Sequence, residues 1–135
     1  MKKSLRQLVR ERAGRRCEYC HLPDFAAPLS DFHVEHVIAM QHGGTDDPEN
    51  RCWSCHRCNC HKGPNLSGRD PLTKNVVRLF DPRRQRWGRH FEWLGAALVG
   101  LTQAGRATIA GRDINDPQRV ELRQILMDEG DWPED

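Results

Sequence analysis

The spacing of apolar residues near the start of the chain predicts a helix. Ser4 and Gln7 have the spacing of a capping box, in which each side chain bonds the backbone of the other, and Gly14 stops the segment. Between these signals, apolar residues recur on one helical face at Leu5, Leu8, Val9 and Ala13. We therefore expect a first helix between Ser4 and Gly14.

A strand, a loop, a second strand and a helix are predicted next. Residues 32–38 (FHVEHVI) are rich in residues that favour strands, and residues 40–50 form a polar loop with a Gly-Gly turn. Residues 51–53 (RCW) predict a short return strand. A helix over about 56–62 then ends at Gly63, which is followed by proline.

The C-terminal half begins with a Gly/Pro-rich connector over residues 63–72. Short apolar runs beyond it predict strands at 76–80, 90–94 and 97–101. Residues 102–111 fit either a helix or a strand, and we favour the helix. Asp116 and Pro117 open a final helix, whose buried side carries Leu122, Ile125 and Leu126.

The composition indicates one ordinary domain. The chain has 135 residues with a mean hydropathy of −0.79, and it contains no apolar run near the roughly 18 residues of a membrane helix. Its first sixteen residues are charged throughout and lack the apolar region of a signal peptide. We therefore expect a cytoplasmic protein, and in that reducing compartment six cysteines favour metal binding or chemistry over disulfides.

The formal net charge of +2 conceals strongly charged segments. Residues 1–16 carry seven Lys/Arg against one acid, and residues 69–90 carry seven against two. Residues 128–135 hold five acids and no base, which predicts an acidic tail. Two basic segments are typical of a face that binds a polyanion, although ordinary solvated surface explains either segment alone.

The cysteines form two C-x2-C pairs. Cys17 and Cys20 make the first pair, and four thiolates from two such pairs supply the closed tetrahedral shell of a structural zinc site. From spacing alone, the second pair is either Cys52 with Cys55 or Cys55 with Cys58.

These motifs resemble those of the HNH endonuclease family. The chain reads CEYC, EHVI, HGG, EN and CHRCNCHKG in the family's order over residues 17–63, and a looser likeness to a bacterial and phage subgroup continues through LFDPRRQRWGRHFEW and LTQAGRAT. The resemblance implies an α+β fold, with a small zinc-stabilised ββα-metal core over about 17–63 and a strand and helix extension over about 71–127. Residues 1–127 would form a single nuclease domain, followed by the acidic tail.

The resemblance also implies roles for individual residues. His36 corresponds to the general base, and Glu35 and Asn59 to the ligands of a divalent ion, for which their hard oxygens suit Mg²⁺ or Mn²⁺. Asn50 corresponds to the central asparagine, which holds the loop and orients the histidine. Because Cys58 directly precedes Asn59, the zinc ligands become Cys17, Cys20, Cys55 and Cys58. Cys52 would then lie in the core and Cys60 on the helix surface.

Two questions stay open at this stage. Glu35 and His36 would point to opposite faces of a regular strand, so both reach one phosphate only if the strand twists or ends there. His33 shares the face of Glu35 and is either an extra ligand or a packing residue.

The function expected is metal-dependent hydrolysis of DNA, with a catalytically silent zinc module that binds nucleic acid or protein as the alternative. Possible DNA contacts are Lys62, Arg83, Arg84 and Arg86.

Overall fold

The computed structural model describes residues 2–62 and 64–133 of the chain. The first helix, α1 (Leu5–Arg12), has the predicted capping box: the Ser4 hydroxyl accepts from the Gln7 amide at 3.1 Å, and the Ser4 amide donates to Gln7 Oε1 at 3.0 Å. Val9 points into the core and is fully buried. Both the helix and its cap were predicted from sequence, and both are confirmed.

The centre of the molecule is an antiparallel hairpin followed by a helix. Strand β1 (Phe32–His36) pairs with β2 (Arg51–Cys55), with Glu35 opposite Cys52, and helix α2 (His56–Lys62) follows β2 without a loop. The long connection holds two 3₁₀ turns, η3 (Met40–His42) and η4 (Pro48–Asn50). The predicted strand, loop, strand and helix order is confirmed, although β2 runs two residues beyond the predicted RCW.

Two more hairpins follow this core. The first pairs β3 (Ser67–Arg69) with β4 (Val76–Arg78), and the second pairs β5 (Phe91–Leu94) with β6 (Ala97–Gly100). Strand β3 lies within the segment expected to be only a connector, because pairing with β4 imposes an extended backbone there. The remaining helices and turns are α3 (Trp87–His90), α4 (Gln103–Arg112), α5 (Pro117–Asp128), η1 (Asp24–Ala26) and η2 (Leu29–Asp31).

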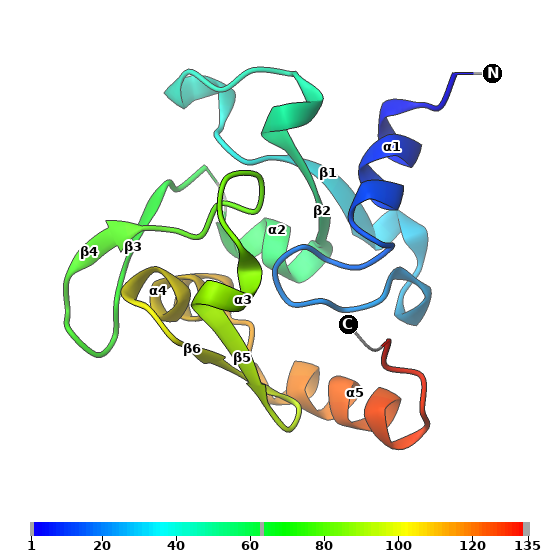
Figure 1. The fold of residues 1–135 in the computed structure, drawn as a ribbon, viewed down its shortest axis with the longest axis vertical. Helices are drawn as coiled ribbons and strands as arrows, with labels where there is room; N and C mark the ends of the chain where they lie inside the picture. The colour runs from blue at the N-terminus through cyan, green and yellow to red at the C-terminus, as the bar shows by residue number, and fades with distance from the viewer. Residues whose placement is uncertain (1, 63, 134–135) are drawn as a thin grey trace.

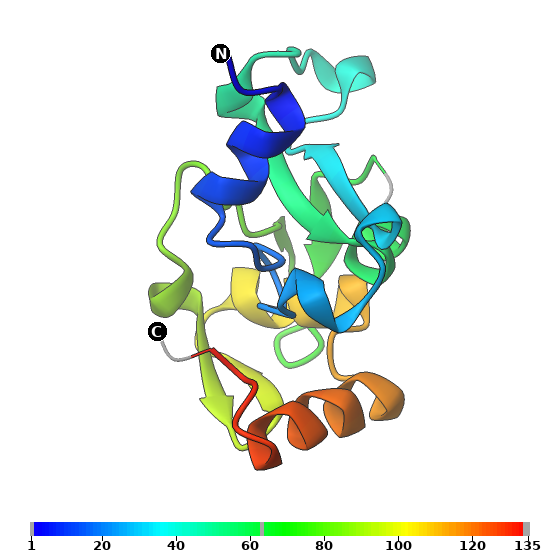
Figure 2. The same cartoon turned by 90° about the vertical axis from the view of Figure 1, so that its right-hand side faces the viewer.

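Helix α4 lies between the hairpin core and the C-terminal elements (Figure 1). The segment 102–111 is therefore helical from its second residue onward, as favoured from the sequence. In Figure 2, α1 and the β1–β2 hairpin occupy one half of the molecule, and β5, β6 and α5 occupy the other. Thr108 of α4 accepts the Phe80 amide at 2.9 Å, and Arg106 bonds both oxygens of Asp70 at 2.9 Å each. The architecture is therefore α+β, as predicted.

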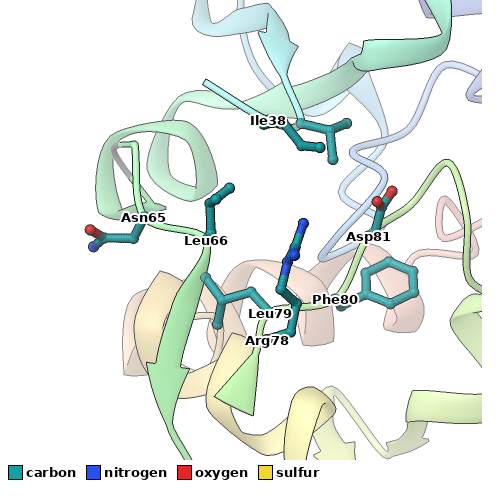
Figure 3. Close-up of a pocket in the computed structure, with 8 residues that line it drawn as sticks. Ile38, Asn65, Leu66, Arg78, Leu79, Phe80 and Asp81 are labelled. Carbon is teal, nitrogen blue, oxygen red and sulfur yellow. The ribbon is translucent and has the colours of Figure 1, made fainter. Parts of the chain in front are cut away.

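A small cavity marks the junction between the loop that leaves β1 and the β3–β4 hairpin. Figure 3 shows Ile38 on one side and Leu66 and Leu79 on the other, with the Arg78 side chain reaching into the space between Leu66 and Asp81. Most of this lining is apolar, so the cavity is a packing junction between the two parts.

None of the helices in the described ranges has the length and apolar character needed to cross a bilayer.

Cys52 is fully buried in the core, whereas Cys60 is exposed on α2, as both were predicted to be. Helix α5 ends at Asp128, and Trp132 beyond it packs edge-on against Trp93. The expected boundary between domain and tail stays a prediction.

Candidate metal centre and catalytic pocket

Four buried sulfur atoms gather in the core. The Sγ atoms of these cysteines all lie within 4.8 Å of one another, and those of Cys20 and Cys55 are 3.7 Å apart. Two sulfurs bound tetrahedrally to zinc at about 2.3 Å each would be about 3.8 Å apart. All four cysteines are free of disulfides, so the group is able to hold a metal ion such as zinc: Cys17, Cys20, Cys55 and Cys58.

The backbone around each C-x2-C pair explains this convergence. After the first pair, the His21 amide bonds the Cys17 carbonyl at 3.0 Å, and His21 has a left-handed φ of 60°, which turns the chain back. The second pair spans the junction of β2 and α2, so Cys55 ends the strand and Cys58 lies in the first helical turn. Hydrogen bonds with the other three sulfurs, Cys17 first, and then burial raise the pKa of the Cys58 thiol well above its ordinary value. A bound cation is what would favour four thiolates in this space.

A separate open pocket lies where β1 ends. Glu35, His36 and Asn59 line it, together with His33, Val34, Ala39, Met40 and Pro64. Glu35 is almost fully buried, while the His36 side chain is 29% exposed. The pairing of β1 with β2 stays regular up to His36, where the strand ends. Glu35 and His36 thus leave the strand in different directions, and both still border this pocket.

The ring of His36 is held by a carboxylate. Its Nε2 lies 2.8 Å from Oδ1 of Asp46, and Nη2 of Arg51 lies 2.8 Å from the same oxygen. The hydrogen bond from His36, with a smaller contribution from the charge of Arg51, lowers the pKa of Asp46. Asp46 was not singled out from sequence, since nothing distinguishes it from Asp47 and Glu49 in the same loop.

Asn50 holds the loop that follows β1. Its side chain accepts from the Ile38 amide at 2.9 Å and donates to the carbonyls of Ile38 at 2.9 Å and Thr45 at 2.8 Å. These bonds engage both the oxygen and the nitrogen of its amide with the loop backbone, whereas the side chain that contacts the His36 ring is Asp46. An effect of Asn50 on the orientation of His36 stays a prediction. Gly44 passes so close that a Cβ there would lie 1.8 Å from the Ile38 carbonyl oxygen.

Residues 17–65 match the family model of HNH endonucleases. This segment is an HNH domain. The match covers the four clustered cysteines, the β1–β2 hairpin, α2 and the pocket lined by Glu35, His36 and Asn59, so it confirms the resemblance drawn from the sequence over this segment. The chain matches no curated protein and no solved structure at a significant level.

A residue from outside the HNH domain reaches into it. Arg112, at the end of α4, is fully buried; its Nη1 donates to the Cys58 carbonyl at 2.9 Å, and its Nη2 lies 3.4 Å from Oε1 of Glu35. Its guanidinium also lies 3.3 Å from the centroid of the Tyr19 ring. Arg112 therefore contacts both a metal-centre residue and the buried acid of the pocket. No local sequence pattern could predict this contact, because Glu35 and Arg112 are 77 positions apart.

The expected DNA contacts have different environments. Arg83 forms an ion pair with Glu18, and its side chain is only 13% exposed. Arg84 and Arg86 are exposed, and they border a surface pocket together with Gln85, Arg89 and His90. The side chain of Lys62 lies outside the described residues. The DNA-binding role of these residues stays a prediction.

Several arginines of the N-terminal basic segment form contacts within the protein. Arg6 bonds the carbonyls of Leu29 and Phe32, and Arg10 pairs with Asp24. Arg12 bonds the carbonyls of Pro48 and Arg51. These side chains bind α1 to the hairpin, to its connecting loop and to the two 3₁₀ turns before it, so several charges of this segment stabilise the fold, which the sequence pattern did not indicate.

Proposed function

We propose that this protein is a metal-dependent endonuclease that hydrolyses DNA phosphodiester bonds. The observation that carries the proposal is the contact of His36 with Asp46 at the border of a pocket that Glu35 and Asn59 also line. A histidine held by a carboxylate, next to two oxygen donors, is an arrangement suited to base-catalysed hydrolysis at a metal.

His36 acts as the general base in this proposal. When its Nε2 carries the hydrogen that is donated to Asp46, Nδ1 keeps its lone pair and takes a proton from the attacking water. Asp46 fixes the ring and stabilises the positive charge that develops on it. The attack is in line with the leaving 3′ oxygen and gives 5′-phosphate and 3′-hydroxyl ends.

Glu35 and Asn59 would hold the catalytic ion. A carboxylate and an amide oxygen are hard donors, which suit Mg²⁺ or Mn²⁺, and they border an open pocket that leaves room for water and phosphate ligands. The ion, when bound, supplies positive charge to the scissile phosphate and the leaving oxygen. Zinc in the four-cysteine site has a separate, structural role, and its thiolates suit the reducing cytoplasm that we propose as the compartment.

The exposed arginines of the second pocket would bind the DNA backbone. Arg84, Arg86 and Arg89 lie within five residues of one another around one hollow, and guanidinium groups bind phosphate with paired hydrogen bonds. We propose phosphate contacts there, outside the catalytic pocket.

A catalytically silent zinc module is the second candidate. The pairing of Glu35 with Arg112 favours it, because a guanidinium already neutralises the acid that the catalytic ion would need. At 3.4 Å this contact is loose, and the Cys52 thiol lies 3.8 Å from Oε2 of Glu35. The carboxylate also borders the open pocket, where an ion would reach it, and this position favours the enzyme.

Plasmid cleavage separates the two candidates. Zinc-loaded protein, freed of other metals on a chelating resin, is incubated with supercoiled plasmid with and without Mg²⁺ or Mn²⁺. Nicking that requires the added ion and falls at least about 100-fold in His36→Ala supports the enzyme. His42→Ala, which removes an exposed histidine from the same loop, is the matched control and should cut normally. Intact plasmid under every condition, with zinc content and fold preserved, would favour the silent module.

A further inference from the structure

Three metal-binding side chains meet on the surface between β1 and α2, apart from the four-cysteine site. His33 Nε2 lies 3.1 Å from His56 Nδ1. The Sγ atom of Cys60 lies 3.3 Å from His56 Nε2 and 3.7 Å from His56 Nδ1. His56 and Cys60 are one turn apart on the same helical face, and His33 reaches them from the strand beneath. His56 and Cys60 are exposed, and His33 is half-buried.

The chemistry of this group differs from that of the catalytic pocket. Two imidazole nitrogens and a thiolate are the donors that Zn²⁺ and similar borderline ions prefer, whereas Mg²⁺ prefers oxygen. Two nitrogens bound tetrahedrally to zinc would lie about 3.3 Å apart, and a nitrogen and a sulfur about 3.5 Å apart. The observed separations of 3.1 Å and 3.7 Å are close to these values.

We propose that His33, His56 and Cys60 form a second site for a borderline divalent cation such as Zn²⁺. Among the described residues, only the four-cysteine group has all of its donor atoms within 4.8 Å of one another. Binding at the second site therefore requires Cys60 to turn about its Cα–Cβ bond. Its side chain is exposed, and a helix leaves two staggered positions open to it.

The position of the site gives it a consequence for catalysis. His33 also lines the catalytic pocket, together with Glu35 and Asn59. A dication held by His33 and His56 would repel a second dication at Glu35 and would narrow access to the pocket. Excess Zn²⁺ should therefore inhibit cleavage, and this part of the inference rests on the proposed nuclease function.

Titration with Co²⁺, a coloured probe for zinc sites, tests the binding itself. Zinc-loaded protein should bind further Co²⁺ and develop visible bands together with a sulfur-to-cobalt charge-transfer band, which the oxygen ligands of the catalytic pocket cannot produce. Zinc released into solution is measured in parallel, which excludes exchange at the four-cysteine site. Cys60→Ser should lose the charge-transfer band, and His33→Ala and His56→Ala should each weaken binding at least about 10-fold. His42→Ala, an exposed histidine outside the cluster, is the matched control.

Binding of no further equivalent, or unchanged binding in both histidine variants, would overturn the proposal. The replaced side chains are exposed or half-buried, so circular dichroism and retention of the first zinc should show intact folding. The titration uses no DNA, so it does not depend on nuclease activity. An uncut plasmid together with a second bound Co²⁺ would refute the proposed function and leave this site standing.

Discussion

His36 and Asp46 form a hydrogen-bonded pair across the loop that joins β1 to β2. Nε2 of His36 lies 2.8 Å from Oδ1 of Asp46, and Arg51 holds the same oxygen from the start of β2. The pair links the end of one strand to the beginning of its neighbour. It therefore depends on the shape of the whole loop, which Asn50 fixes through its bonds to Ile38 and Thr45.

Replacing Asp46 by Asn should lower the turnover of DNA cleavage at least about 10-fold. The neutral amide of asparagine cannot stabilise a positively charged His36 ring as the carboxylate does. DNA affinity and melting temperature should stay close to wild type. Single-turnover cleavage at saturating DNA measures the effect. Asp47→Asn, which changes the adjacent exposed acid, is the matched control. An equal loss in both variants would assign the effect to the loop in general.

Substituting Gly44 by Ala should destabilise the protein by about 1–3 kcal/mol, because the new Cβ would meet the Ile38 carbonyl oxygen at 1.8 Å and the Asn50 amide nitrogen at 2.9 Å. Urea unfolding gives the free-energy change. The matched control is Gly88→Ala, where a Cβ has no atom within 4 Å and φ is not positive. Similar stabilities of the two variants would show that the loop backbone shifts to make room for the new Cβ at little cost.

Much of the N-terminal half of the chain could be predicted because its signals are local. The capping box of α1, the two C-x2-C pairs and the change from strand to helix at Cys55 all depend on residues close in sequence. The four-cysteine group required a choice between Cys52 and Cys58, and it is the Sγ atom of Cys58 that lies with the other three.

The contacts that could not be predicted join distant parts of the chain. Strand β3 exists because it pairs with β4, although its Ser-Gly-Arg sequence has little preference for strands. Arg112 meets Glu35 only after α4 packs on α2. Charge counts also could not separate Arg83, which pairs with Glu18, from the exposed Arg84 and Arg86. In each case tertiary packing decides what the local sequence leaves open.

Cys20→Ala should lose the bound zinc and much of the protein's stability, since metal binding to such a site contributes directly to folding. Elemental analysis and thermal unfolding test this together. Cys60→Ala should keep the zinc of the four-cysteine site, because Cys60 is exposed and outside that group. Full zinc content in the Cys20 variant would show that Cys20 is not a zinc ligand.

His90 should make stability depend on pH near neutrality. Burial, with a smaller contribution from the charge of Arg89, lowers the pKa of His90, and its Nδ1 contacts the Thr102 hydroxyl at 2.6 Å. Unfolded His90 takes up a proton below about pH 6.5, whereas folded His90 resists it until lower pH. Its stabilising contribution is therefore complete above pH 6.5 and is lost as the pH falls through its folded pKa.

The stability difference between wild type and His90→Gln should accordingly narrow as the pH falls from 7.5 to 5.5, a range that we choose to keep zinc bound. Urea unfolding at several pH values, with zinc content measured at each, gives the two curves. His42→Gln should follow the wild-type curve, since His42 is exposed in the loop. A constant difference across the range would exclude His90 as the source of the dependence.

Substitutions of the exposed arginines should weaken DNA binding, whereas substitution of His36 should slow DNA cleavage. Each phosphate contact contributes a slope of about −0.9 to the salt dependence of duplex binding. Replacing Arg84, Arg86 and Arg89 by Ala should therefore weaken binding and flatten the slope by up to about 2.7, while turnover at saturating DNA stays within about tenfold. Fluorescence anisotropy at several salt concentrations measures both quantities.

The matched variants for this experiment are Arg119→Ala, which removes a half-buried arginine from α5, and His36→Ala. Arg119→Ala should leave the slope unchanged, and His36→Ala should bind DNA with the wild-type affinity and slope while failing to cut it. Arg83 is kept intact, because breaking its pair with Glu18 would disturb the first C-x2-C segment. A triple variant with full affinity and an unchanged slope would show that the arginine pocket is ordinary solvated surface, and DNA would then have to be bound by another part of the molecule.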